Sequence, residues 1–345
     1  MKIRFHLLAL VLALAAPAHA QLFDVTIDPV DFDRWMYPFN GTPGVRNAAS
    51  TFIALDPCFD NKDGQFVIAV DTAAAGIPTG QGLSNYSFIT IRVTATHSFV
   101  SAGGAGMTYD PTYDAWQTYL DPMDPLYVAD GDSGRPIELY GVGIRTPYVG
   151  PLSFNPLTAG PTEFEEAERF TEVPFDPMDM PCLGQTPGIR NIYPLGFGTP
   201  DPEDDVSNNV QRNAPLTGSG FDVTPWAIGE STSGLTPGDP VPEGAFNVSA
   251  GETFEFILDL SDPDIENYVK EGLNAGTLSF AITSMHSTGA MSSDSNPNFY
   301  TFESTDTAAI DPTVEIGVIV PEPGVGALLA AGGLLVVCLA RRRNR

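Results

Sequence analysis

Short runs of β-branched and aromatic residues, separated by turn residues, recur along most of the chain. Val, Ile, Phe and Thr dominate each run, which is the composition typical of β-strands. The connections between the runs are rich in Pro, Gly, Asn and Asp, which favour turns. We therefore expect strands at residues 65–70, 88–94, 137–144, 253–260, 277–285 and 313–320.

Only two stretches carry helical signals. Thr162 and Glu165 form a capping box that opens a short helix ending near residue 170. Asp262 followed by Pro263 is typical of a helix N-terminus, an apolar residue recurs every fourth position after them, and Gly276 follows the last. Many strands and two short helices predict an all-β fold, a β-sandwich or jelly-roll-like body. Because no linker divides it, we expect a single ectodomain over residues 21–319.

The first twenty residues differ from this pattern. Lys2 and Arg4 precede an apolar run of ten residues at 7–16, and Ala18 and Ala20 give a small-x-small cleavage site. The run is too short to span a bilayer, and the three features together are typical of a secretory signal peptide. Residues 1–20 are therefore predicted to be removed, which leaves Gln21 as the first residue.

The C-terminal segment, residues 320–345, combines a proline motif, an apolar stretch at 324–340 and a basic cluster. The motif and the cluster consist of Pro321, Glu322, Pro323 and of Arg341, Arg342, Arg343. A helix over the apolar stretch would be about 25 Å long, enough to cross a thin hydrocarbon core as a single transmembrane helix. The arginines would hold its end on the cytoplasmic side.

In this order, the three parts resemble the PEP-CTERM sorting signal of bacterial surface proteins. The resemblance implies that an exosortase-type processing enzyme recognises Pro321, Glu322 and Pro323 and cleaves near them. It also implies a protein of the cell envelope, the cell surface or the extracellular matrix, anchored in the membrane before processing. The alternative is an ordinary C-terminal membrane anchor.

Residues 254–285 carry a second resemblance. Their predicted order of strand, short helix and strand is similar to a segment of DNRLRE-type β-sandwich domains, which occur on bacterial surface proteins. Several of those domains are linked to carbohydrate. The similar segment is short and has no chemistry of its own, so it supports the predicted fold more than a function.

Charge narrows the choice of partners. The chain has a net charge of −27, and residues 21–320 hold 10 basic and 42 acidic residues, a net charge of −32. A body this anionic repels a phosphate backbone, which argues against nucleic acid as a partner. Cys58 and Cys182 are the only cysteines of the exported part, and after export a disulfide between them could persist. We expect the bridge, with two free thiols as the alternative.

Catalytic motifs are lacking. The sequence has no GxSxG, HExxH or P-loop pattern, and only His97 and His286 remain after the signal peptide. Residues 131–134 imitate the surroundings of a trypsin-like nucleophile, but only 36 residues separate His97 from Ser133, where that family has about 140. We therefore expect no enzyme.

Calcium is the inorganic partner that the acidic loops favour. Oxygen-rich loops occur at residues 56–64, 121–132 and 201–208, and Ca²⁺ needs six to eight oxygen ligands. None of these loops has the spacing of an EF-hand. The predicted ligands are Asp121, Asp124, Asp130 and Asp132. The alternative is a solvated acidic surface.

Three functions remain, in this order. The first is an exported, non-catalytic surface or matrix protein. The second is a module that binds exopolysaccharide, with calcium assisting. The third is a secreted hydrolase. Trp35, Trp116 and Trp226 would stack on sugars if exposed, but we expect them in the core of a sandwich.

Overall fold

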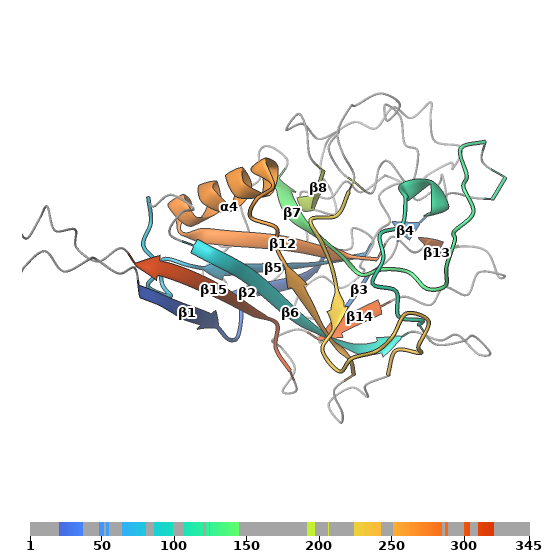
Figure 1. Ribbon diagram of the computed structural model, residues 1–345, viewed down its shortest axis with the longest axis horizontal. Coiled ribbons are helices and arrows are strands. Elements are labelled where there is room, and N and C mark those ends of the chain that lie inside the picture. The colour runs from blue at the N-terminus through green and yellow to red at the C-terminus, as the bar shows by residue number, and fades with distance from the viewer. Residues whose placement is uncertain are drawn as a thin grey trace, which may run out of the picture.

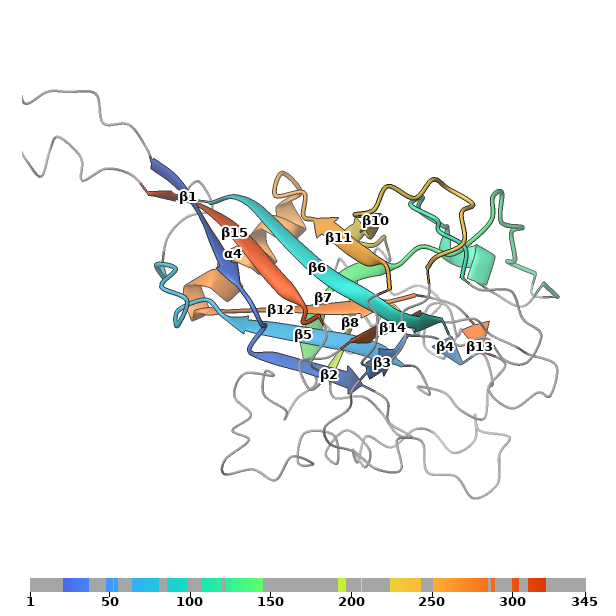
Figure 2. The ribbon, with the colours of Figure 1, turned by 90° about the horizontal axis from the view of Figure 1, so that it is seen from below.

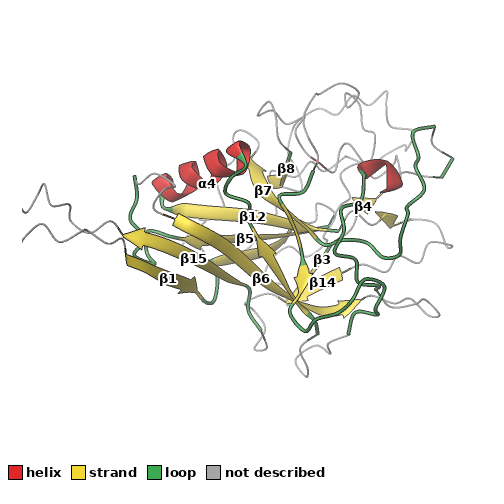
Figure 3. Ribbon diagram, in the orientation of Figure 1, coloured by secondary structure: helices red, strands yellow, loops and turns green. Residues whose placement is uncertain are grey.

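Two antiparallel β-sheets pack on each other in the computed structural model, giving a sandwich-like, mostly β architecture (Figure 1, Figure 2). One α-helix lies along this sandwich in the part of the chain that the structure describes (Figure 3). The described residues are 21–36, 48–51, 53–54, 64–80, 86–98, 107–119, 122–123, 125–144, 192–196, 206, 224–242, 251–284, 287–288, 300–303 and 310–320.

The first sheet joins both ends of the described chain. Its strand order is β1-β15-β6-β11-β10, and β14 pairs with both β6 and β3. The bounds are β1 Gln21–Ile27, β3 Ala48–Ser50, β6 Tyr86–Ser98, β10 Glu230–Ser231, β11 Thr253–Ile257, β14 Tyr300–Glu303 and β15 Thr313–Val320.

The second sheet has the order β2-β5-β12-β7-β8, with β9 paired to β7. A separate parallel pair joins β4 to β13. The bounds are β2 Phe32–Met36, β4 Ile53–Ala54, β5 Gln65–Asp71, β7 Glu138–Ile144, β8 Ile192–Leu195, β9 Ala227–Ile228, β12 Thr277–Thr283 and β13 Ser287–Thr288.

The core lies between the sheets. Successive side chains of a strand point to opposite faces of its sheet, so every second side chain points into the core. On β6, Ile89, Ile91 and Val93 are buried in the core. Arg92 lies on the other face, where it makes ion pairs with Glu255 at 2.6 Å and Glu315 at 2.8 Å from the two neighbouring strands. This face of the first sheet is therefore polar and held by cross-strand pairs.

The second sheet is buried on both faces. Phe66, Ile68 and Val70 of β5 belong to the main core, while Val67 and Ala69 between them belong to a second cluster of buried residues. Burial on both faces explains why β5 appears in the sequence as an unbroken apolar run rather than an alternating one.

Helix α4, Pro263–Ala275, is the helix predicted from Asp262 and Pro263. The Asp262 side chain caps it by accepting hydrogen bonds from two backbone N–H groups of its first turn, and Gly276 ends it with a φ of 85°. Its buried residues, Ile265, Val269 and Leu273, join the same core as the inner faces of the sheets. The helix lies beside β12 (Figure 1).

Strands occur in all six predicted ranges, as β5, β6, β7, β11, β12 and β15. β11 is shorter than expected because the chain after Ile257 turns toward α4, where Ser261 donates two hydrogen bonds to Asp259. The structure adds a 3-10 helix, η2, at Trp116–Tyr119. The helix expected near Thr162 lies outside the described residues.

The tryptophans contribute to the core as expected. Trp226 is buried in it, and Trp35 and Trp116 pack against it while partly buried. Within the described ranges, no helix has the length and apolar character needed to cross a membrane. The stretch at 324–340, for which a membrane span is predicted, lies outside those ranges, as do residues 1–20.

Candidate metal centre

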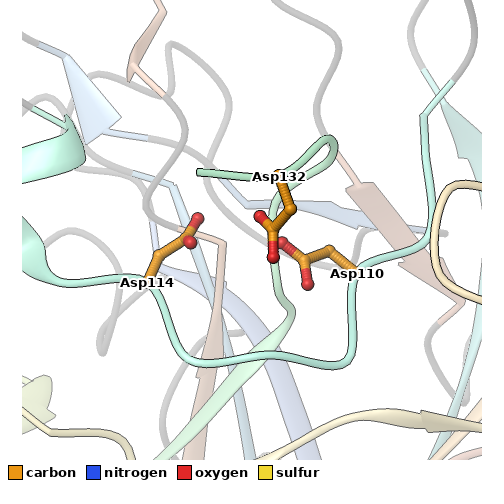
Figure 4. A group of neighbouring side chains, drawn as sticks. All are labelled: Asp110, Asp114 and Asp132. Carbon is orange, nitrogen blue, oxygen red and sulfur yellow. The ribbon is translucent and has the colours of Figure 1, made fainter. Parts of the chain in front are cut away.

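Three aspartates from two separate loops meet at one place. Asp110 and Asp114 precede the 3-10 helix η2, and Asp132 lies in the loop that leads to β7. One carboxylate oxygen of each lies within 4.8 Å of the others, and the three side chains face one another in Figure 4. Asp110 and Asp114 are buried and Asp132 is exposed. We call this group the aspartate cluster.

Backbone pairing fixes the first loop to the sandwich. Tyr109 donates its N–H to the carbonyl of Asp239 at 2.8 Å, and its own carbonyl accepts from Gly238 at 2.9 Å. The Tyr109 hydroxyl accepts from the N–H of Ser231 in β10 at 3.0 Å. Asp110 follows directly, so its position depends on pairing with a segment more than one hundred residues away in the chain.

A glycine lets the second loop approach the first. Gly134 has a φ of +120°, and a Cβ on it would lie 2.8 Å both from Cβ of Asp110 and from the carbonyl oxygen of Thr108. Any side chain here would therefore be strained and would collide with the first loop. Gly134 keeps Asp132 close to Asp110.

Arg135 supplies a positive charge beside the aspartate cluster. Its guanidinium donates to Asp114 at 2.8 Å and to Asp130 at 2.9 Å, and it also reaches Thr118 at the 3-10 helix η2. Asp114 and Asp130 are thus bridged through one cation. Asp130 is therefore connected to the aspartate cluster through Arg135.

Burial makes the anionic forms of the two inner carboxylates costly. It raises the pKa of Asp114 from 3.8 to about 6, although the hydrogen bond and the charge of Arg135 oppose the rise. Burial also raises the pKa of Asp110, against the hydrogen bonds from Thr112 and with the nearby charges of Asp132 and Asp130 adding to it. A cation bound among these oxygens would offset the cost, and a set of carboxylate oxygens suits a hard cation.

The structure brings together only part of the metal site predicted from the sequence. Asp132 belongs to the aspartate cluster, and Asp130 is linked to the cluster through Arg135, whose Nη1 contacts both Asp130 and Asp114. Asp121 and Asp124 lie outside the described residues. Sequence reasoning missed Asp110 and Asp114, for which the available signal was two aspartates spaced by three residues around Thr112.

Other predicted sites also lie outside the described residues. They are the cysteines Cys58 and Cys182, the motif Pro321, Glu322 and Pro323, and the basic cluster Arg341, Arg342 and Arg343. The disulfide and the sorting signal therefore stay predictions.

The two predicted processing points border strands that pair with each other. Gln21, the predicted first residue after the signal peptide, opens β1, and Val320, which precedes Pro321, closes β15. The two strands are antiparallel, and Gln21 is the partner of Val320. The start of β1 and the end of β15 therefore lie side by side at one end of the molecule (Figure 1).

No family model matches the chain, and no curated protein matches it either.

Proposed function

We propose that this protein is an exported, non-catalytic component of the cell surface or extracellular matrix, released from the membrane by an exosortase-type enzyme acting at residues 321–323. The single observation that carries the proposal is the pairing of Gln21 with Val320. Both predicted processing points flank this pair directly.

The pairing fits two processing events that leave the fold intact. Removal of residues 1–20 leaves all of β1, and cleavage beyond Val320 leaves all of β15. The seven residues of β1 each have a partner in β15, so the edge of the sheet is complete without either terminal segment. The pairing of β1 with β15 therefore needs no residue from either terminal segment.

The arrangement also orients the body. The start of β1 and the end of β15 lie at one end of the long axis, and the segment 107–135, green in Figure 1, lies at the other. A C-terminal membrane helix would hold the first end close to the bilayer. The aspartate cluster would then face away from the membrane, toward the medium or matrix.

The proposal assigns no catalytic role to Ser133 or Glu252. Ser133, in the segment that imitates a protease nucleophile, is exposed on the loop after Asp132. The buried carboxylate of Glu252 accepts hydrogen bonds from Ser231 at 2.6 Å and from the hydroxyl of Ser233 at 2.7 Å. These hydrogen bonds hold a turn, so the Glu252 carboxylate has a structural role.

A variant that lacks the motif Pro321, Glu322 and Pro323 tests this proposal. We expect Pro321→Ala, Glu322→Ala and Pro323→Ala together to leave export intact but to block release, so that the variant stays in the membrane fraction at higher mass. N-terminal sequencing serves as the control, because both proteins should begin at Gln21. Identical mass and location of variant and wild type would mean that the C-terminus is an ordinary anchor.

A further inference from the structure

We propose that Asp110, Asp114 and Asp132 form a Ca²⁺ site that ties the loop before the 3-10 helix η2 to the loop before β7. This proposal is independent of the sorting proposal, since it rests only on the geometry of the described body. Four observations carry it.

The first observation is a buried carboxylate oxygen without a partner. Asp110 is only 3% exposed. Its Oδ1 accepts from the N–H of Thr112 at 2.8 Å and from the Thr112 hydroxyl at 2.5 Å, but its Oδ2 is buried with no hydrogen bond. The carboxylate faces the other two aspartates (Figure 4). A buried anionic oxygen without a donor is costly, and a cation is the partner that such an oxygen lacks.

Glu252 shows what a satisfied buried carboxylate looks like in this protein. It is also 3% exposed, yet both of its oxygens accept hydrogen bonds, Oε1 from Ser231 and Oε2 from Ser233. At Glu252 the fold therefore supplies a donor to each carboxylate oxygen. Asp110 differs in having one oxygen left over.

The second observation is that two carboxylates, Asp110 and Asp132, share the single hydroxyl proton of Thr112. The hydroxyl oxygen of Thr112 lies 2.5 Å from Asp110 Oδ1 and 2.9 Å from Asp132 Oδ2. A hydroxyl has one proton and can donate to only one of the two carboxylates at a time. The other contact sets oxygen against oxygen, which a cation bound beside them would relieve.

The third observation is the charge balance. Asp110, Asp114, Asp130 and Asp132 carry four negative charges when ionised, and Arg135 supplies one positive charge. Arg135 is engaged with Asp114 and Asp130. A divalent cation among the aspartate cluster would reduce the local charge from −3 to −1, by Coulomb attraction in a partly buried setting.

The fourth observation is the spacing, which suits calcium. Ca²⁺ binds oxygen at 2.3–2.6 Å, so ligands on opposite sides of the ion are up to about 5 Å apart. The aspartate oxygens lie within 4.8 Å of one another. Mg²⁺ demands near-ideal octahedral geometry and dehydrates reluctantly, whereas the flexible coordination of Ca²⁺ suits carboxylates that come from two loops. The exposed Asp132 leaves a path for the ion to enter and room for water to complete its coordination.

The experiment measures ion binding and thermal unfolding on the full-length protein purified in detergent. Calorimetric titration with CaCl₂ should give saturable binding, and 1 mM Ca²⁺ should raise the Tm by a few degrees in high NaCl. Site binding stabilises the folded state by an amount that saturates with concentration, whereas screening follows ionic strength. MgCl₂ and NaCl at matched ionic strength should give a clearly smaller shift.

Three variants locate the site. Asp110→Asn keeps the Oδ1 acceptor for Thr112 and removes one buried charge, so it should raise the Tm without calcium and weaken Ca²⁺ binding by more than about tenfold. Asp132→Asn changes an exposed side chain and should weaken binding without harming the fold. Glu271→Gln is the matched control, because it removes one charge from the exposed face of α4 and should keep the full response.

One result supports the calcium site, and each of three others overturns it. Loss of the calcium response in Asp110→Asn and Asp132→Asn, with the response kept in Glu271→Gln, supports the site. Absence of saturable binding up to millimolar Ca²⁺ overturns it. So does a response of the same size to Mg²⁺ or NaCl, or one that survives in both aspartate variants, because the acidic loops would then be only a solvated surface.

Discussion

Gly141 of β7 lies directly against the indole ring of Trp226. A Cβ on Gly141 would overlap Cη2 of the ring and lie 2.7 Å from Cζ2. Trp226 is buried, its backbone N–H donates to the carbonyl of Leu139, and its ring meets the ring of Tyr268 edge-on at 4.7 Å. The missing side chain at Gly141 thus makes room for the residue that joins β7 to α4.

We predict that Gly141→Ala is destabilising. The added methyl group meets a rigid ring rather than a flexible chain end, so the core must shift, at a cost of about 1–3 kcal/mol. Urea unfolding of the full-length protein measures the change. Gly131→Ala is the control, because a Cβ there would meet nothing within 4 Å. Equal stabilities for the two variants would contradict the packing argument.

The Tyr268 hydroxyl should contribute to stability through two hydrogen bonds. It donates to the carbonyl of Ser279 at 2.7 Å and accepts from the N–H of Val142 at 2.9 Å, which links α4 to two strands. Tyr268→Phe leaves both backbone groups without this partner, a loss of about 1–3 kcal/mol. Chemical denaturation should show a smaller loss for Tyr86→Phe, whose hydroxyl donates a hydrogen bond to the Pro78 carbonyl at 2.8 Å. The reverse order would count against this role.

The N-cap of α4 should be replaceable by another capping residue but not by alanine. Asp262 accepts from the N–H groups of Asp264 at 2.8 Å and Ile265 at 3.2 Å. Asp262→Ala should lower the free energy of unfolding by about 1 kcal/mol, whereas Asp262→Ser should recover most of it. Thermal unfolding followed by circular dichroism tests both. Similar losses in the two variants would mean that the side chain does not act as a cap.

Asp311 should make stability depend on pH. Burial, and secondarily the charge of Asp28, raises the pKa of Asp311 above 3.8. The folded protein therefore holds this proton more tightly than the unfolded chain. The contribution of Asp311 to stability improves as the pH falls through the folded-state pKa, and it is unfavourable at pH 7.

Asp311→Asn should accordingly stabilise the protein at pH 7, with a gain that shrinks as the pH approaches 4. Asp28→Asn, at an exposed position, should give a smaller gain of the same sign, since it removes only the repelling charge. Urea midpoints at several pH values measure both. A gain that does not change with pH would show that charge is not its cause.

Local sequence signals were sufficient for the elements whose stability is local. Asp262, Pro263 and Gly276 mark the ends of α4, because a helix is capped by its own neighbours in the chain. β15 has the predicted bounds because β-branched residues fill it from Thr313 to Val320. The predicted strands did not include β1 or β2. β1 depends on pairing with β15 almost three hundred residues away.

The sequence by itself determined α4 and the strands β5, β6, β7, β11, β12 and β15, and it specified an acidic body that repels polyanions. Only the tertiary structure decided which acidic side chains meet. Asp110 reaches Asp132 because Tyr109 pairs with residues 238–239 and because Gly134 has no side chain. Neither contact leaves a local pattern, since each joins segments that are distant in the chain. Propensity and capping act between neighbours, whereas the burial that leaves Asp110 Oδ2 without a partner is a property of the whole fold.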